Sequence, residues 1–197
     1  MSRNPEFDSL LQELCNHVSS FYGTPDSQFS ALANKITEDM LKTYEAKDQD
    51  YASNGKPMGN LRGSEHLGIP AWKAVLLRMS DKKQRITSFI NRGKFEVDDE
   101  KVTDTLIDLA NYALLGLILF REVYGTGRKN NNFHVEKLGP EFLADAHFFN
   151  ISVCALRSKI LHELNHKDDD SSAAWNGKNW NTLVESFEIV AEFARSV

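Results

Sequence analysis

Between residues 100 and 111, four polar residues recur at the spacing of one helical face, and three of them are acidic. They are Glu100, Asp104, Asp108 and Asn111. Carboxylates four residues apart on a helix repel one another and need a compensating positive charge. Mg²⁺ or Mn²⁺ would supply it, because both ions prefer oxygen ligands. The stripe therefore predicts a metal site, and two alternatives stay open: an ion-pair network with cations of a neighbouring helix, or a solvated face.

A second charged stripe lies upstream and is mostly basic. Arg78, Asp81, Lys82 and Arg85 follow one another at helical spacing, and Lys82 falls within the apolar sector of the expected helix. One interpretation is a border of long side chains whose stems cover apolar surface. The other makes Asp81 a further metal ligand and the three cations a cradle for phosphate oxygens. The second arrangement would suit a polyphosphate bound with Mg²⁺.

A third motif, His162-Glu163-Leu164-Asn165-His166, has the spacing of the zinc metalloprotease signature. Its two histidines could share a Zn²⁺ ion while Glu163 acts as general base. However, both histidines are expected opposite the apolar face of their helix, and a charged run follows at 167–170. The pattern therefore favours a solvated helix end with ion pairs, and a zinc protease is the more distant alternative.

The elements that must position these residues are all expected to be helical. Apolar residues recur at helical spacing, and no stretch alternates as a strand would. We expect helices at about 5–22, 24–51, 70–92, 98–124, 140–164 and 182–195. Asn4 and Pro5 are suited to start the first helix, and Asp98 or Asp99 to cap the fourth. Four glycines and a proline at 52–69 predict a mobile loop, long enough to act as a lid. The predicted fold is an all-α bundle of about six helices.

The fourth expected helix differs from an ordinary amphipathic helix. One face is a core face, and the half of the helix after Asn111 is apolar nearly all round, as in buried helices. Its acidic stripe should therefore point at protein rather than at water. The predicted core face consists of Val102, Leu106, Leu109, Ala113, Leu117 and Phe120.

Composition narrows the function classes. The 197 residues include 41% hydrophobic and 26% charged residues and carry a formal charge of −5, which excludes wholesale disorder and a global basic field for duplex nucleic acid. The two cysteines stand in apolar contexts and are expected to be reduced and buried. The first residues lack the apolar core of a signal peptide, and no uninterrupted apolar run is long enough for a membrane span. We expect a cytoplasmic protein without a membrane partner.

Three segments match a known family. Residues 47–51 resemble its Lys-x-x-Asp-Tyr segment, residues 78–85 its Arg-x-Ser-Asp-Lys-x-x-Arg segment, and residues 104–113 its Asp-Thr-x-x-Asp-x-Ala-Asn-Tyr-Ala segment. The chain thus resembles the nucleotide modification associated domain family of phages and bacteria, which is itself similar to MazG-like all-α pyrophosphohydrolases of nucleoside triphosphates. The resemblance implies an all-α, oligomeric fold, with a core at 1–125 that carries its motifs at 47–112. Residues 126–197 would be a helical extension packed on the same domain.

The resemblance also implies an activity and a set of roles. Related enzymes use Mg²⁺ to cleave a nucleoside triphosphate into a monophosphate and pyrophosphate. The implied metal ligands are Asp81, Glu100, Asp104 and Asp108, with Asp50 or Glu100 orienting the attacking water. The implied phosphate ligands are Lys47, Arg78, Lys82 and Arg85. Tyr51, Asn111 and Tyr112 would shape the pocket for base and sugar.

The same residues suit a second class of function. A protein that binds a nucleotide without turnover, to sequester a nucleotide signal or to assist base modification, would need the same basic and acidic stripes. Both readings imply a nucleotide as ligand and a homo-oligomer, and the hydrolase adds Mg²⁺ or Mn²⁺. The sequence leaves the choice between them open.

Overall fold

The computed structural model describes residues 4–20, 27–51, 58–92, 101–125, 139–165 and 177–197, without the side chains of residues 27, 48–51, 165, 177 and 178. These ranges contain six α-helices, one 3-10 helix and no strand. The predicted all-α bundle is confirmed. The elements are α1 (Pro5–Ser20), α2 (Ser27–Tyr51), η2 (Arg62–Leu67), α3 (Ala71–Arg92), α4 (Val102–Tyr124), α5 (Pro140–Asn165) and α6 (Gly177–Ser196).

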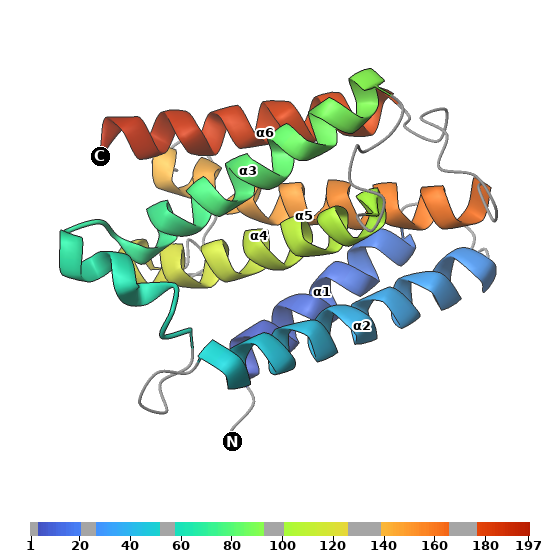
Figure 1. Ribbon diagram of the computed structural model, residues 1–197, viewed down its shortest axis with the longest axis horizontal. Coiled ribbons are helices and arrows are strands. Elements are labelled where there is room, and N and C mark those ends of the chain that lie inside the picture. Colours follow the sequence, from blue (N-terminus) through green and yellow to red (C-terminus); the bar gives the residue numbers. More distant parts are fainter. Residues whose placement is uncertain (1–3, 21–26, 52–57, 93–100, 126–138, 166–176) are drawn as a thin grey trace.

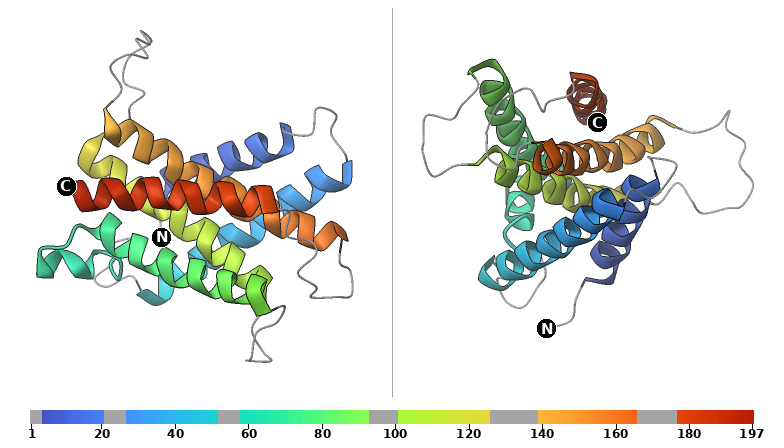
Figure 2. Two further views of the ribbon diagram at one scale, coloured as in Figure 1. Left: turned by 90° about the horizontal axis from the view of Figure 1, so that it is seen from above. Right: turned by 90° about the vertical axis from the view of Figure 1, so that its right-hand side faces the viewer.

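Helices α4 and α5 form the middle of the bundle. In Figures 1 and 2, α3 and α6 lie on one side of this pair, and α1 and α2 on the other. Helix α5 packs against α1, α2, α4 and α6, and α3 packs along α4. Every other α-helix therefore buries an apolar face against this central pair, which is how a single helical core is closed.

Helix α4 is buried as its sequence predicts. All six residues of the predicted core face are buried, and so is every residue from Ala113 to Phe120. By length and composition α4 is also the one helix in the described ranges that could cross a membrane, but 78% of its apolar window lies inside the bundle. The core of the fold accounts for its hydropathy.

The first two helices form a pair that supports one wall of the cleft described below. Asn4 accepts hydrogen bonds at its Oδ1 from the backbone N–H groups of Glu6 and Phe7, at 3.1 and 3.4 Å, which caps α1 as predicted. Phe7 stacks on Tyr44 of α2 with a distance of 4.1 Å between ring centroids. This contact fixes the C-terminal half of α2, which carries Lys47.

The segment between α2 and α3 is more ordered than the predicted loop. Within its described part, residues 58–69, η2 forms and ends at Gly68, whose φ of 73° is left-handed. Arg62 donates to both carboxylate oxygens of Glu122 on α4 at 2.7 Å. This ion pair joins η2 to the bundle, and the expectation of a loop was wrong for residues 62–67. Residues 52–57, the rest of the predicted lid, lie outside the described ranges.

Two other helix starts differ from expectation or are not described. Helix α6 begins at Gly177, five residues before the predicted start. Helix α4 begins at Val102, and its predicted caps Asp98 and Asp99 lie outside the described part of the chain.

Both cysteines are free and buried, as predicted. Burial raises the pKa of the Cys154 thiol to about 11, because the apolar surroundings oppose the thiolate more than the nearby Arg157 favours it. This thiol is therefore protonated at neutral pH, as expected of a packing residue rather than a nucleophile.

Candidate functional site

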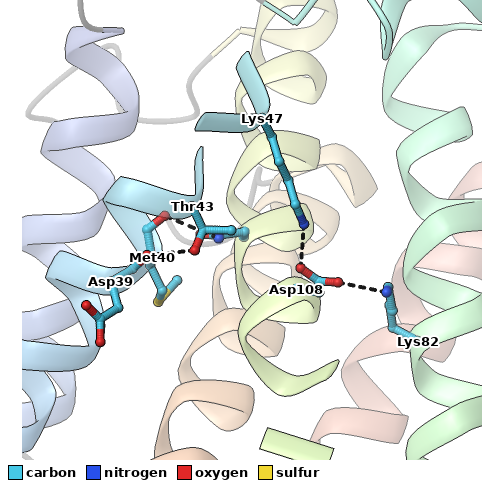
Figure 3. Close-up of polar contacts among 7 residues, drawn as sticks. Asp39, Met40, Thr43, Lys47, Lys82 and Asp108 are labelled. Carbon is cyan, nitrogen blue, oxygen red and sulfur yellow. Dashed lines mark hydrogen bonds and ion pairs between the residues drawn. The ribbon is translucent and has the colours of Figure 1, made fainter. Parts of the chain in front are cut away.

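Asp108 of α4 is held between two lysines that come from two other helices. The Lys47 Nζ of α2 lies 2.7 Å from Asp108 Oδ1, and the Lys82 Nζ of α3 lies 2.7 Å from Oδ2 (Figure 3). The Asp108 side chain is 23% exposed, whereas Lys47 is 49% and Lys82 20% exposed. A single carboxylate thus ties α2, α3 and α4 together at one point.

The two lysines decide the ionisation of Asp108. Burial alone would raise its pKa, but hydrogen bonds from Lys47 and Lys82 and their positive charges outweigh it and hold the pKa below its ordinary value. Asp108 is therefore an anion at neutral pH. The group of three carries a net positive charge, since two ammonium groups share one carboxylate.

This charged group forms part of the wall of an open cleft between α2, η2, α3 and α4. The cleft has a volume of about 570 Å³, within the usual size of ligand sites. Arg78 of α3 adds a third cation and has no ion-pair partner within the described ranges. Three cations thus face one carboxylate in a protein whose overall charge is negative. The lining consists of Lys47, Asn60, Leu61, Gly63, Ser64, Ala74, Arg78, Lys82, Asp108 and Tyr112.

A smaller cavity continues from the cleft toward the core. Its volume is about 60 Å³, several times the roughly 10–15 Å³ that one water requires. It shares five residues with the cleft and adds Tyr44, Met58, Asn111 and Leu115 as its other walls. Met58 holds a left-handed backbone, with φ of 58°, and its side chain is buried. Such a conformation is uncommon for a residue with a side chain, and here it accompanies a side chain that closes the cavity.

Asn111 is a buried polar residue in the wall of this cavity. It is 6% exposed, and its Nδ2 donates to the Met40 carbonyl of α2 over 3.4 Å. Its Oδ1 is buried and has no hydrogen-bond partner within the described part of the chain. Unpaired buried acceptors are rare in folded proteins, and this one belongs to a residue that lines a cavity, which makes it a candidate contact for a ligand.

The residues expected from the sequence fall into three groups. Lys47, Lys82, Arg78 and Asp108 meet at the cleft, and Asn111 and Tyr112 lie at the inner cavity. Asp81 is exposed on α3, and neither it nor the half-buried Arg85 lines the cleft or the cavity. Glu100 and the side chains of Asp50 and Tyr51 lie outside the described ranges.

The described carboxylates do not form a ready metal site. Both oxygens of Asp108 are bonded to lysines, as in the ion-pair alternative. Asp104, one turn earlier, is exposed and lines a different hollow of about 350 Å³ between α2, α4 and α5. Across the ranges described above, no three acidic, histidine or cysteine side chains are grouped so that they could hold an ion. These residues as placed do not fit Mg²⁺.

The His-Glu-x-x-His motif on α5 does not lie at the solvated helix end that the sequence predicts. His162 is buried, 6% exposed, so the prediction of a solvated helix end is wrong for this residue. Its helix is covered on several sides because α5 is central to the bundle. Glu163 pairs with Lys159 one turn earlier on the same helix, and His166 lies outside the described ranges.

The segment before η2 supplies residues that were not expected from the sequence. Met58 lines the inner cavity, and Asn60 and Leu61 line both the cavity and the cleft. Their residue types give no chemical signal, and the glycine-rich context predicts a loop. Only the tertiary contact of η2 with α3 and α4 places them at the site.

A comparison with known protein families finds a match that covers the α3–α4 half of this site. Residues 70–120 match the family described as nucleotide modification associated domain 1. No curated protein and no solved structure matches the chain. The matched range includes Arg78, Lys82, Asp108, Asn111 and Tyr112, and Lys47 lies before it. The similarity to the nucleotide modification associated domain 1 family thus covers residues 70–120, the α3–α4 half of the cleft.

Proposed function

We propose that the protein binds a nucleoside phosphate, with the phosphates in the open cleft and the base in the inner cavity. The observation that carries this proposal is the position of Asp108, which holds Lys47 of α2 and Lys82 of α3 together at the wall of the cleft. The family of residues 70–120, named for nucleotide modification, supports a nucleotide as the class of ligand.

The cations of the cleft keep hydrogen-bond donors that could bind an anion. Each lysine ammonium has three N–H donors, and the bond to Asp108 uses one of them. The remaining donors and the Arg78 guanidinium would meet phosphate oxygens, which Arg grips with two parallel bonds and Lys as a point charge. Asp108 keeps the lysine side chains extended toward the cleft before the ligand arrives, which lowers the cost of ordering them on binding.

The inner cavity has room for an aromatic ring beside the charged group. Its walls are mainly apolar and aromatic, from Tyr44, Leu61, Tyr112 and Leu115, and the amides of Asn60 and Asn111 supply polar groups. Aromatic side chains contact planar rings through offset or edge-to-face arrangements. A base that enters this cavity would leave its phosphates next to Lys47 and Lys82, because both lysines lie in the outer cleft and Lys47 also borders the cavity.

Titration calorimetry with ribo- and deoxyribonucleoside triphosphates tests this proposal. We expect one nucleotide or more to bind, and Lys82→Met to weaken binding by about tenfold or more, since a charge-assisted hydrogen bond contributes roughly 1.5–3 kcal/mol. Lys83→Met is the matched control, because Lys83 pairs with Glu188 of α6 and does not line the cleft. Equal affinities for the Lys82 variant and the native protein would contradict the proposal.

The second candidate is hydrolysis of the bound triphosphate to a monophosphate and pyrophosphate, which the resemblance noted in the sequence would imply. One observation favours it: Asp104 and Asp108 lie one turn apart on α4 and both line the hollow between α2, α4 and α5. Since the placed carboxylates do not fit a metal, the hydrolase needs ligands beyond them, and Glu100 is the nearest candidate in sequence.

Ion-exchange chromatography of each nucleotide, incubated with Mg²⁺ or Mn²⁺, separates the two candidates. A hydrolase releases pyrophosphate, and Asp104→Asn abolishes that release while nucleotide still binds. A protein that only binds gives no product with any triphosphate, although calorimetry detects the complex.

A further inference from the structure

We propose that Asn111 selects nucleotides whose base carries an exocyclic amino group, as adenine and cytosine do, over those with a keto oxygen at the same position. The selecting atom is Asn111 Oδ1, which would accept a hydrogen bond from the amino group. This inference rests on the proposed nucleotide binding and adds the class of base.

The first step is the orientation of the amide. Asn111 Nδ2 donates to the Met40 carbonyl, and this bond directs the nitrogen end of the amide toward α2. The oxygen is the end left without a partner, and Asn111 lines the inner cavity. The cavity therefore presents a hydrogen-bond acceptor from a side chain that is nine-tenths buried.

The second step is the composition of the wall around Asn111. The neighbouring walls from Met58, Leu61 and Leu115 are apolar. Asp108 also borders the cavity, but both of its oxygens already accept bonds from lysines. The other polar groups of the lining are the hydroxyls of Tyr44 and Tyr112, the Asn60 amide and the Lys47 ammonium. Among the lining acceptors, Asn111 Oδ1 is one that is buried and has no hydrogen-bond partner in the described ranges.

The third step concerns the base. When the phosphates occupy the outer cleft, the edge of the base farthest from the sugar enters the cavity first. That edge carries an amino donor in adenine and cytosine, and a carbonyl acceptor in hypoxanthine and uracil. An amino group would donate to Asn111 Oδ1, whereas a carbonyl oxygen at that position would face a second acceptor. With a keto base, Oδ1 would gain a donor only if the base shifted to bring its neighbouring ring N–H into reach. Sites that hydrogen-bond a substrate group discriminate strongly against analogues without that group.

The test uses pairs of ligands that differ at this position alone. ATP is compared with ITP, and CTP with UTP, by titration calorimetry on the full chain. We expect the amino member of each pair that binds to bind about tenfold more tightly, as an unpaired buried acceptor implies. This measurement on the native protein does not depend on whether any variant folds.

Asn111→Leu should remove the difference by weakening the amino member, and Asn181→Leu, at an exposed position of α6, is the matched control. Circular dichroism confirms that each variant is folded. Pairs that bind equally to the native protein, while Lys82→Met still weakens them, would overturn the selectivity and leave nucleotide binding intact. If no triphosphate binds at all, the proposed function itself fails.

Discussion

Asp108 forms ion pairs with two lysines that lie far from it in the sequence. Lys47 precedes it by 61 residues and Lys82 by 26. The carboxylate stabilises the fold by tying three helices together, and it keeps two cations at the cleft. Removal of the charge should therefore affect both the stability of the protein and its affinity for an anion.

The contribution of Asp108 to stability should depend on pH in one direction. Its pKa is lower in the folded protein than in the unfolded chain, so the folded state is favoured above the unfolded pKa. This advantage is lost as the pH falls below about 4 and through the folded pKa. We expect Asp108→Asn to lower the free energy of unfolding by about 1 kcal/mol at pH 7, because the pair is partly exposed.

Urea unfolding of the native protein and of Asp108→Asn at pH 7, 5 and 3 measures this effect. The difference between the two proteins should persist at pH 5 and shrink at pH 3. A difference that is the same at all three pH values would show that the ion pairs with Lys47 and Lys82 do not stabilise the fold. The control is Asp39→Asn, because Asp39 pairs only with the exposed Lys42 in the described contacts of its helix.

At the residue scale, the sequence predicts which side chains matter better than it predicts their partners. Lys82 stands in an apolar sector and Asp108 on an acidic stripe, and both anomalies mark the site. The choice between a metal and an ion-pair network depended on whether cations from other helices reach Asp108. Helical spacing carries no information on contacts across 61 residues, so Lys47 could enter only through the family resemblance.

At the scale of elements, the close approach of α4 and α5 depends on a glycine. A Cβ added at Gly116 would lie 2.7 Å from a ring carbon of Phe148, which is completely buried. Alanine favours helix over glycine by about 1 kcal/mol, but an extra methyl group in a packed core costs typically 1–3 kcal/mol. At position 116, helix propensity therefore favours alanine and core packing opposes it. The buried Phe148 ring has little room to move away from an added methyl group.

We expect Gly116→Ala to lower the free energy of unfolding by about 1–2 kcal/mol, which thermal or urea unfolding would detect. Gly63→Ala in η2 is the control, because no atom lies within 4 Å of a Cβ at that position. Its stability should change little or increase. A Gly116→Ala variant as stable as the native protein would mean that α4 and α5 are not packed this closely.

The ends of helices were predictable where a local signal exists. Asn4 with Pro5 marks the start of α1, and Gly125 follows the last residue of α4. The described start of α6 and the η2 helix were not predictable, because their positions depend on contacts with other elements. Glycines near η2 indicate a loop, whereas the Arg62–Glu122 pair, which only the fold creates, holds the segment against α4.

At the scale of the whole molecule, the site forms where the outer helices meet the central pair. The α1–α2 pair supplies Lys47, α3 supplies Arg78 and Lys82, and α4 supplies Asp108 and Asn111. The all-α class and the buried character of α4 were evident from hydrophobic periodicity. The central place of α5 was not, because the sequence predicts one apolar face for this helix, whereas the bundle covers it on several sides.

The overall charge of −5 also makes the cleft distinctive. An anion is repelled by most of such a surface and is attracted where three cations outnumber one carboxylate. The site should therefore take phosphate-bearing ligands through a local field rather than a general one. This local field would therefore determine where the phosphates bind as well as how tightly they bind.

The most direct measurement is a crystal structure of the protein with the nucleoside triphosphate that binds most tightly in calorimetry. We expect phosphate oxygens within hydrogen-bond distance of the Lys82 and Lys47 ammonium groups, with Arg78 alongside and the base in the cavity lined by Asn111. Phosphates bound at another surface, with the Lys47–Asp108–Lys82 group unchanged and the cleft without nucleotide, would contradict the account.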